Sequence, residues 1–261
     1  MIFDKDTKLI ISISNSPTNF GVTIYNYIFK ELSLKYVYLP FKSVKSLEVT
    51  NAIKTLDIVG CSISSPLKTE MVQHMDELDE TVKKLNNLNT IKNVSGCLKG
   101  FNTDYFGFNE VLKNREINSV LLYGTGSVSK TILQALVDRG VNKIYLEGRT
   151  ENNIGKLLIN FSNWVLPYNG EKIDVFINAT PAGNSKNDDL FKYLKNTNLL
   201  MDLNVSPIEN ALILESKAQG IETLKGTEMS MYQLQKQFEI YTGITPGIEL
   251  IKSGLSKFFK S

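Results

Sequence analysis

Short apolar runs alternate with longer amphipathic stretches along most of the chain, and this alternation predicts an α/β fold. The short runs are rich in Val, Ile, Leu and Tyr, which is typical of strands buried in a mostly parallel sheet. We predict strands at residues 9–14, 36–41, 58–62, 89–92, 98–101, 120–123, 143–147, 175–178, 199–203 and 222–224. The amphipathic stretches predict helices at residues 22–34, 47–56, 68–75, 103–113, 128–139, 209–219, 229–241 and 247–259.

This pattern also predicts two domains. The segment from Asn93 to Gly96 separates two apolar runs and predicts a hairpin, which inside a parallel pattern marks the end of a unit. A new strand, glycine turn and helix begin near Val120. We therefore predict one domain over residues 1–104 and a second over 105–239, with the boundary near 104–109. Residues 242–247 contain Gly and Pro and are typical of a hinge, and we expect residues 240–261 to pack back on the first domain.

The composition is that of a soluble globular protein, with 42% apolar and 21% charged residues. No apolar run approaches the roughly 18 residues of a membrane helix. The first ten residues carry charges where a signal peptide needs an apolar core, so we expect a cytoplasmic protein. The net charge of +2 offers no broad basic surface for nucleic acid, and the expected partner is a small molecule. We expect a monomer or a homodimer.

The counts of cysteine and histidine narrow the chemistry. Two cysteines, Cys61 and Cys97, are too few for a disulfide scaffold or a Cys-only zinc site. His74 is the single histidine, so sites with several His ligands are excluded, and we expect no metal. Catalysis by a Ser-His-Asp triad would have to use His74. We therefore expect Lys, Asp, Glu or Tyr to transfer protons if the protein is an enzyme.

The apolar run at 120–123 leads into Gly124-Thr-Gly126 and then a helix, the arrangement of a dinucleotide-binding turn. Gly124 permits the tight turn, and Gly126 lets the backbone approach a pyrophosphate at the helix N-terminus. The third glycine of the usual pattern is replaced by Ser129. Two other interpretations stay open at this point. One is an ordinary strand–helix turn, and the other is a phosphate-binding loop ending in Ser129-Lys130-Thr131, which lacks one required glycine.

The end of the next strand, about 20 residues further on, is where the adenine ribose of a dinucleotide binds. Glu147 and Arg149 both lie there. An acid favours the ribose hydroxyls of NAD, whereas an arginine favours the 2′-phosphate of NADP. We favour Arg149 and NADP, with an Arg149–Glu147 surface pair as the alternative. The segment from Asn178 to Gly183 follows another strand and gives supporting polar groups at the same edge of the sheet.

Polar groups also follow strands in the first half of the chain, in the segments 12–17, 60–68 and 100–104. Lys68 falls at the start of a predicted helix, where the positive end of the helix dipole disfavours a cation, so a functional role would explain it. Taken singly, each segment is also what a loop or a helix cap looks like.

Together, these segments resemble the shikimate dehydrogenase family, and they occur in the family's order through most of the chain. The opening Ser14-x-x-Pro17-x-Asn19-Phe20-Gly21 is most similar to the branch called shikimate dehydrogenase-like. The blocks are Ser14-x-Ser16-Pro17, Gly60 through Pro66-Leu-Lys68, Asn89-Thr90, Gly100-x-Asn102-Thr103-Asp104, Gly124-x-Gly126, Arg149-Thr150, Asn178-Ala-Thr180-Pro-x-Gly183, and Gly226-x-x-Met229-x-x-x-Gln233 with Phe238.

The resemblance implies an N-terminal α/β substrate domain, a Rossmann-type NADP domain and reversible, NADP-dependent reduction of 3-dehydroshikimate to shikimate. It implies a place in chorismate and aromatic amino acid biosynthesis. Lys68 and Asp104 match the family's acid–base pair. The implied substrate contacts are Ser14, Ser16, Ser64, Asn89 and Gln233, and the implied cofactor contacts are Gly124, Gly126, Ser127, Val128, Arg149, Thr150, Asn178, Thr180 and Gly226.

Several positions depart from the family pattern. Ser62 and Ser64 replace the usual Asn and Thr, Gly148 replaces an Asn, and Val205 replaces a pocket tyrosine. These departures leave two alternatives: an oxidoreductase with weak shikimate activity and a different hydroxy-acid substrate, or a non-catalytic NADPH-binding sensor. Because both Lys68 and Asp104 are retained, we favour an enzyme.

Overall fold

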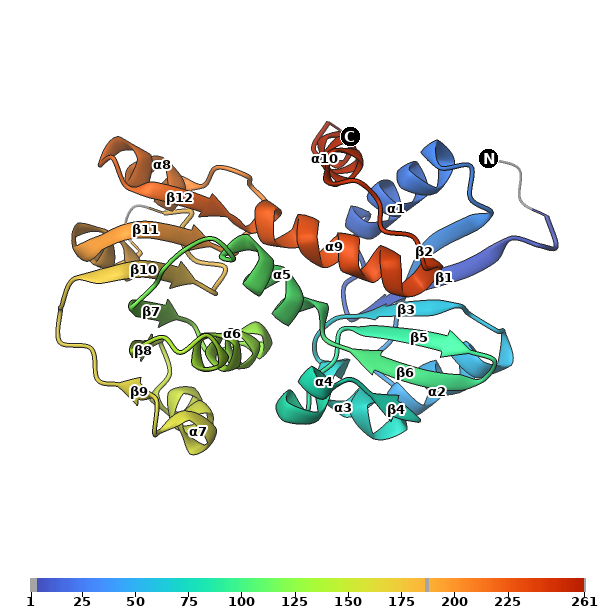
Figure 1. Cartoon of the computed structure of the whole chain (residues 1–261), viewed down its shortest axis with the longest axis horizontal. Helices are drawn as coiled ribbons and strands as arrows, with labels where there is room; N and C mark the ends of the chain where they lie inside the picture. Colours follow the sequence, from blue (N-terminus) through green and yellow to red (C-terminus); the bar gives the residue numbers. More distant parts are fainter. Residues whose placement is uncertain (1–3, 186–187, 261) are drawn as a thin grey trace. The chain divides into compact units, whose positions relative to one another are not determined.

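The computed structural model describes residues 4–185 and 188–260. The chain forms two compact units, which we call the first unit (Met1–Gly107 with Met231–Ser261) and the second unit (Phe108–Ser230). Helix α5 (Thr103–Val111) and helix α9 (Gly226–Thr242) each begin in one unit and end in the other (Figure 1). The chain therefore changes unit inside helices rather than in loops, and no linker composition marks these points.

The first unit contains a six-stranded sheet with the strand order β2-β1-β3-β5-β6-β4. Strands β1, β2 and β3 are parallel, whereas β5 runs antiparallel to both β3 and β6. The turn between β5 and β6 is the predicted hairpin, which is confirmed by the pairing of Val94 with Cys97. The strands are β1 (Lys8–Ser14), β2 (Tyr36–Lys42), β3 (Gly60–Ile63), β4 (Glu77–Leu78), β5 (Thr90–Val94) and β6 (Cys97–Phe101).

Alternate residues of β1 point to opposite faces of this sheet and build two cores. Ile10 packs with α1, α9 and α10 on one face, and Ile11 and Ile13 pack with α2 and α3 on the other. The last helix packs on α1, where Phe258 meets Phe20 edge to face at 5.1 Å, so its predicted return to the first unit is confirmed. The remaining helices are α1 (Phe20–Glu31), α2 (Ser46–Thr55), α3 (Leu67–Glu70), α4 (Glu80–Leu85) and α10 (Ile248–Phe258).

One predicted helix of the first unit needs correction. The stretch 68–75 is a four-residue α-helix, α3, followed by the 3₁₀ turn η1 (Met71–His74). Leu67 and Met71 are fully buried in the core, whereas Met75 already has an extended backbone with φ at −87° and ψ at 140°, so the helical segment ends before it. Lys68 is consequently the second residue of a very short helix.

The second unit contains a parallel six-stranded sheet with the order β12-β11-β10-β7-β8-β9. Counted along the chain from β7, this is the 3-2-1-4-5-6 order of doubly wound dinucleotide-binding folds. The topological switch point lies beside β7, whose five residues are all buried. The elements are β7 (Ser119–Tyr123), α6 (Ser127–Asp138), β8 (Lys143–Glu147), α7 (Glu151–Phe161), β9 (Val165–Leu166), β10 (Ile173–Asn178), η2 (Asp189–Asn196), β11 (Thr197–Asp202), α8 (Ala211–Ala218) and β12 (Glu222–Lys225).

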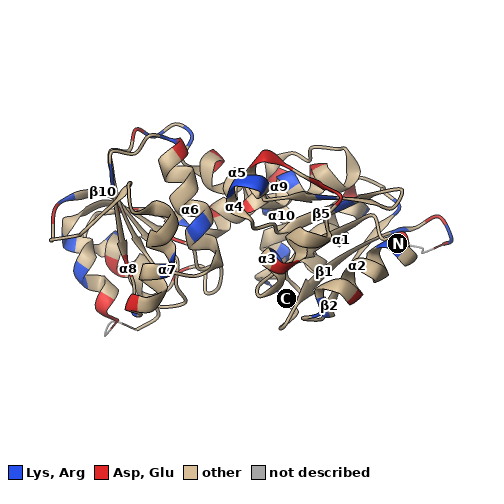
Figure 2. Ribbon diagram, turned by 90° about the horizontal axis from the view of Figure 1, so that it is seen from below, with Lys and Arg blue, Asp and Glu red and all other residues tan. Residues whose placement is uncertain are grey.

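Lys and Arg residues alternate with Asp and Glu residues along the ribbon of each unit in Figure 2. Many form short-range pairs on the surface, such as Lys45 with Glu48 at 2.7 Å and Lys252 with Glu249 at 2.6 Å. Exposed pairs of this kind contribute little stability. Among the helices of the described residues, none is long and apolar enough to cross a membrane.

Candidate active site

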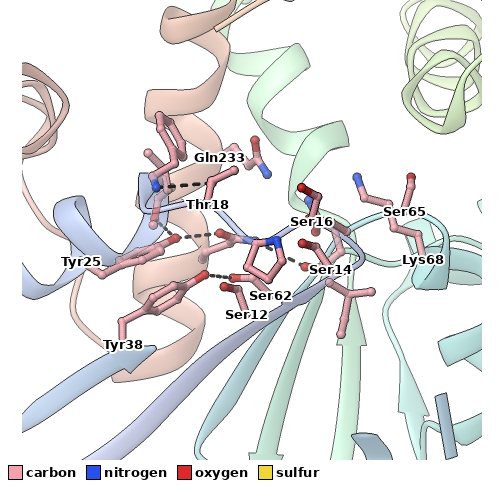
Figure 3. A pocket seen from close by; sticks show the side chains of 18 of the residues that line it. Ser12, Ser14, Ser16, Thr18, Tyr25, Tyr38, Ser62, Ser65, Lys68 and Gln233 are labelled. Carbon is pink, nitrogen blue, oxygen red and sulfur yellow. Dashed lines mark hydrogen bonds between the residues drawn. The ribbon is translucent and has the colours of Figure 1, made fainter. Parts of the chain in front are cut away.

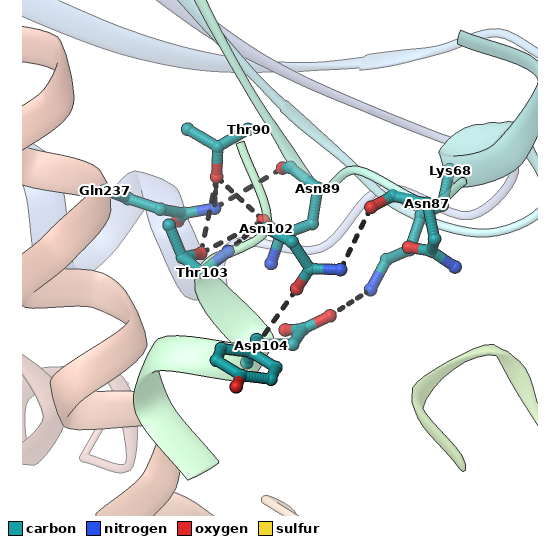
Figure 4. Close-up of polar contacts among 9 residues, drawn as sticks. Lys68, Asn87, Asn89, Thr90, Asn102, Thr103, Asp104 and Gln237 are labelled. Atoms are coloured by element: carbon teal, nitrogen blue, oxygen red, sulfur yellow. Dashed lines mark hydrogen bonds and ion pairs between the residues drawn. The ribbon is translucent and has the colours of Figure 1, made fainter. Parts of the chain in front are cut away.

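Lys68 and Asp104 form an ion pair in the first unit, with Lys68 Nζ 2.6 Å from Asp104 Oδ2 (Figure 4). The side chains are only 15% and 7% exposed, respectively. A pair so withdrawn from water needs both partners, because removal of either leaves an uncompensated charge. The structure thus brings together the two side chains that the sequence suggested for acid–base chemistry.

Local hydrogen bonds fix the backbone on both sides of this pair. The carbonyl of Lys68 accepts from the N–H of Leu88 at 2.9 Å. Asn102 precedes α5, and its side-chain oxygen accepts from the N–H of Tyr105 at 3.1 Å as a helix cap, while its amide donates to the carbonyl of Asn87 at 3.0 Å. Asp104 lies in the first turn of α5, where the helix dipole stabilises a carboxylate.

A pocket of about 430 Å³ opens beside Lys68 (Figure 3). It is formed by the ends of β1 and β3, the start of α1 and one side of α9, all within the first unit. Most of the side chains that line it carry a hydroxyl or an amide group. The five predicted substrate contacts all line it, namely Ser14, Ser16, Ser64, Asn89 and Gln233.

Two buried polar atoms on this wall have no hydrogen-bond partner: Ser14 Oγ and Asn89 Nδ2. Buried polar groups in folded proteins are nearly always satisfied, and leaving one unsatisfied costs about 1–3 kcal/mol. The oxygen of the same Asn89 side chain is well satisfied, since it accepts from the N–H of Thr103 at 2.9 Å. The Ser14 hydroxyl and the Asn89 amide nitrogen are therefore candidate contacts for a polar ligand in this pocket.

The residues that line the pocket but were not predicted as substrate contacts include Tyr25, Tyr38, Ser62 and Gln237. Tyr38 donates to Ser62 Oγ at 2.9 Å, and Tyr25 donates to Gln237 Oε1 at 2.7 Å. Burial raises the pKa of Tyr38 to about 12, so this phenol keeps its proton. Ser62 lies in a polar segment that the sequence singled out, but nothing local distinguishes Tyr25, Tyr38 or Gln237 from ordinary core residues.

The single histidine does not form a hydrolytic triad. His74 Nε2 lies 3.0 Å from Ser46 Oγ, but the Ser46 hydroxyl donates to Glu70 rather than to the histidine. A histidine acting as base must accept the proton of the nucleophile. Ser46 is also only 4% exposed, so this cluster joins α2 to the α3–η1 segment. No group of three or more metal-binding side chains occurs in the described part of the chain.

In the second unit, Gly124 occupies a backbone conformation that other residues rarely adopt, with φ at +129°. A Cβ atom there would lie 2.9 Å from the carbonyl oxygen of Ala179. Gly126 is the N-cap of α6, and a Cβ atom there would meet nothing within 4 Å. Ser127 and Val128 follow as the first residues of α6. Open space above a helix N-terminus, with no side chain at the cap, fits the pyrophosphate of a dinucleotide.

The same geometry excludes the phosphate-binding loop as an alternative. Helix α6 begins at Ser127, so Ser129, Lys130 and Thr131 are already helical. Ser129 and Thr131 are fully buried. In a phosphate-binding loop the hydroxyl at the position of Thr131 has to be exposed, because it binds a metal ion.

Arg149 and Thr150 follow β8 and are exposed. In the described part of the chain, no ion pair joins Arg149 to Glu147, so the surface-pair interpretation finds no support. The guanidinium of Arg149 is thus available to an anionic ligand at the end of the sheet.

Asn178 belongs to a buried network that shapes the loop after β10. Its oxygen accepts from Thr180 Oγ1 at 2.7 Å, and its amide donates to Asp202 Oδ1 at 3.0 Å. Burial raises the pKa of Asp202, an effect that hydrogen bonds from Asn210 and Asn204 oppose. Both Asn178 and Asp202 are fully buried, so this network positions Thr180 rather than exposing Asn178.

Gly226 begins α9 against the end of β11. A Cβ atom there would overlap the carbonyl oxygen of Leu203, so only glycine fits this close approach. Gly226 therefore has a packing role in addition to its predicted role in cofactor binding.

Comparison with known proteins gives the family. Residues 10–91 match the model of the shikimate dehydrogenase substrate binding domain. A curated shikimate dehydrogenase (NADP(+)) from Methanosphaera stadtmanae is 31% identical, with 92% of each chain covered. The chain belongs to the shikimate dehydrogenase family. A shikimate dehydrogenase-like protein from Haemophilus influenzae is 28% identical over 96% of each chain.

Solved structures agree with this family. A shikimate 5-dehydrogenase-like protein superposes with a TM-score of 0.90 at 25% identity, covering 100% of both chains. A shikimate dehydrogenase in complex with NADP⁺ superposes with a TM-score of 0.86 at 27% identity, covering 98% of this chain and 97% of that one. The predicted two-domain α/β fold with a Rossmann-type domain is confirmed.

Two departures from the shikimate dehydrogenase pattern have visible consequences. The Ser62 hydroxyl, in place of an asparagine amide, lies 2.8 Å from the Tyr241 hydroxyl as well as close to Tyr38. At Gly148, a Cβ atom would lie 3.2 Å from the methyl group of Thr125, so the missing side chain leaves room for the glycine turn. The structure gives no explanation for Val205.

Proposed function

We propose that this protein is an NADP-dependent oxidoreductase that acts on a CH–OH group and reversibly reduces 3-dehydroshikimate to shikimate. The observation that carries the proposal is the buried Lys68–Asp104 pair beside a pocket with two unsatisfied polar atoms, Ser14 Oγ and Asn89 Nδ2. Relatives named shikimate dehydrogenase (NADP(+)) support this substrate and cofactor.

In this proposal the first unit binds the hydroxy acid and the second unit binds the cofactor. When bound, NADPH supplies a hydride to the substrate carbonyl carbon. Lys68 stabilises the negative charge that develops on the carbonyl oxygen and donates a proton to it. Asp104 orients the Lys68 ammonium and accepts a hydrogen bond from a substrate hydroxyl.

Neutral donors hold the substrate in this scheme. Ser14 and Ser16 bind its carboxylate, and Ser64, Asn89 and Gln233 bind its hydroxyl groups. The pyrophosphate of the cofactor is held by the turn from Gly124 through Val128. Around it, Arg149 and Thr150 bind the 2′-phosphate, and Asn178, Thr180 and Gly226 shape the nicotinamide side of the site.

The decisive test is an absorbance assay near 340 nm in which NADP⁺ is reduced by a panel of hydroxy acids. We expect shikimate to be oxidised. Faster oxidation of quinate or another hydroxy acid would replace shikimate as the substrate and favour the alternative that Ser62 and Ser64 suggest. If no hydroxy acid is oxidised while NADPH still binds, the protein is a sensor and the proposal is wrong.

Replacing Arg149 with alanine should raise the KM for NADP⁺ at least ~10-fold and leave that for NAD⁺ nearly unchanged, because the guanidinium pairs only with the 2′-phosphate. Steady-state kinetics with both cofactors checks this. Lys156→Ala, which removes an exposed charge from α7, serves as the control for general electrostatics. If Arg149→Ala changed the KM for NADP⁺ and the KM for NAD⁺ equally, Arg149 would not bind the 2′-phosphate.

A further inference from the structure

Gln237 projects from α9 into the wall of the substrate pocket and has both ends of its amide occupied. Its oxygen accepts from the Tyr25 hydroxyl at 2.7 Å. Its nitrogen donates to Thr90 Oγ1 at 2.8 Å, as Figure 4 shows. The residue is only 4% exposed. Since neither end is free for a ligand, Gln237 acts through its partners.

The hydrogen bond from Gln237 sets the direction of the next one. A threonine hydroxyl has a single proton to donate, and at Thr90 the Gln237 N–H already occupies an acceptor position. The Thr90 proton is therefore free to point at Asn89 Oδ1, 2.9 Å away. The N–H and the hydroxyl of Thr103 donate to the same oxygen, at 2.9 and 3.1 Å.

This concentration of donors on one side fixes the orientation of the Asn89 amide. If the amide turned over, its N–H groups would face these donors, and the unsatisfied nitrogen would leave the pocket. In the structure, Asn89 Nδ2 is instead buried without a partner, and Asn89 lines the pocket.

We propose that Gln237 is a positioning residue that, through Thr90, keeps the donor side of the Asn89 amide turned toward the hydroxy acid. Its role in turnover rests on the proposed function, in which Asn89 contacts the substrate. The hydrogen-bond relay itself needs no substrate and can be tested separately.

Two variants separate the relay from simple packing. Gln237→Met keeps most of the volume but removes the donor, and Gln237→Glu keeps the shape but replaces the donor with an oxygen. Both should raise the KM for the hydroxy acid about tenfold, the equivalent of one hydrogen bond, with kcat and the KM for NADP⁺ within about threefold of wild type.

Gln235→Met is the matched control. Gln235 lies on the same helix and donates to the carbonyl of Pro246 at 2.8 Å, away from Thr90. Its loss should leave the KM for the hydroxy acid unchanged. Equal KM increases in Gln235→Met and Gln237→Met would show that the effect comes from helix stability, and this would overturn the proposal.

A pH profile of Gln237→Glu gives a readout that packing alone would not move. A protonated carboxyl carries one O–H and can donate to Thr90, whereas the carboxylate cannot. At each pH, the KM of Gln237→Glu for the hydroxy acid is divided by that of Gln237→Met. This ratio should decrease as the pH is lowered. Burial raises the pKa of the neighbouring Tyr25 and Tyr241 phenols above their ordinary range, so neither titrates in the assay. A flat ratio contradicts the relay.

The side-chain amide signals of Asn89 test the relay in the ligand-free protein. They are assigned in ¹⁵N-edited NMR spectra by their disappearance in Asn89→Asp. Gln237→Met should shift them and accelerate their hydrogen exchange, while Gln235→Met should not. If no hydroxy acid is oxidised, the proposed function fails but these signals still decide the relay. Unchanged Asn89 signals in Gln237→Met overturn it.

Discussion

Replacing Lys68 with alanine is expected to reduce turnover at least ~100-fold while NADP binding stays nearly intact. The side chain lies 2.6 Å from Asp104 on the wall of the substrate pocket, and the proposed mechanism gives it the proton that reaches the carbonyl oxygen. Lys68 belongs to the first unit, whereas the glycine turn for the cofactor belongs to the second. Single-turnover kinetics and NADPH fluorescence titration measure the two effects separately.

Loss of Lys68 also leaves the Asp104 carboxylate buried and unpaired, which itself destabilises the protein. The double variant Lys68→Ala, Asp104→Asn removes this charge and should recover stability without recovering turnover. Lys99→Ala is a control, because Lys99 pairs with Glu77 at 2.8 Å in the same unit but does not line the pocket. Wild-type turnover in Lys68→Ala would remove Lys68 from the mechanism.

Alanine substitutions at the two glycines of the turn after β7 should have different effects: Gly126→Ala should lower NADP affinity, and Gly124→Ala should lower stability. Gly126→Ala adds a methyl group that meets no protein atom within 4 Å, so the fold is retained, but the methyl occupies the path of the pyrophosphate. We expect NADP affinity to fall at least ~10-fold with little change in the melting temperature.

Gly124→Ala should instead destabilise the second unit. The positive φ alone costs about 1–3 kcal/mol for a residue with a Cβ atom, and that atom would also lie 2.9 Å from the backbone of Ala179. Chemical denaturation and fluorescence titration on both variants provide the test. Full NADP affinity in Gly126→Ala, or wild-type stability in Gly124→Ala, would contradict this account of the turn.

The hydrophobic pattern predicted the long buried elements well and the marginal ones poorly. The strand predicted at 143–147 coincides with β8, because its apolar residues are flanked by clear turns. Helix α7 was missed, since it contains Gly and three Asn residues and Phe161 is its one buried residue. Strands β4 and β9 have two residues each, which is too short for any periodicity.

For the site, ordered motifs identified residues whose chemistry is local, but not those whose role depends on a distant partner. Lys68 and Asp104 belong to recognisable blocks of the family pattern. Gln237 does not, and its function is visible only once the fold brings Tyr25, 212 positions earlier, to its side-chain oxygen. Hydrogen-bond direction is a property of the folded chain that composition and spacing do not encode.

The wall of the pocket contains one ionic side chain among the described residues, that of Lys68, and its charge is already matched by Asp104. An organic acid would therefore be held by dipoles instead of by an opposite ion. Added electrolyte weakens attraction between separated charges far more than it weakens short dipolar contacts. The dissociation constant of a hydroxy acid should consequently change little between dilute buffer and molar potassium chloride.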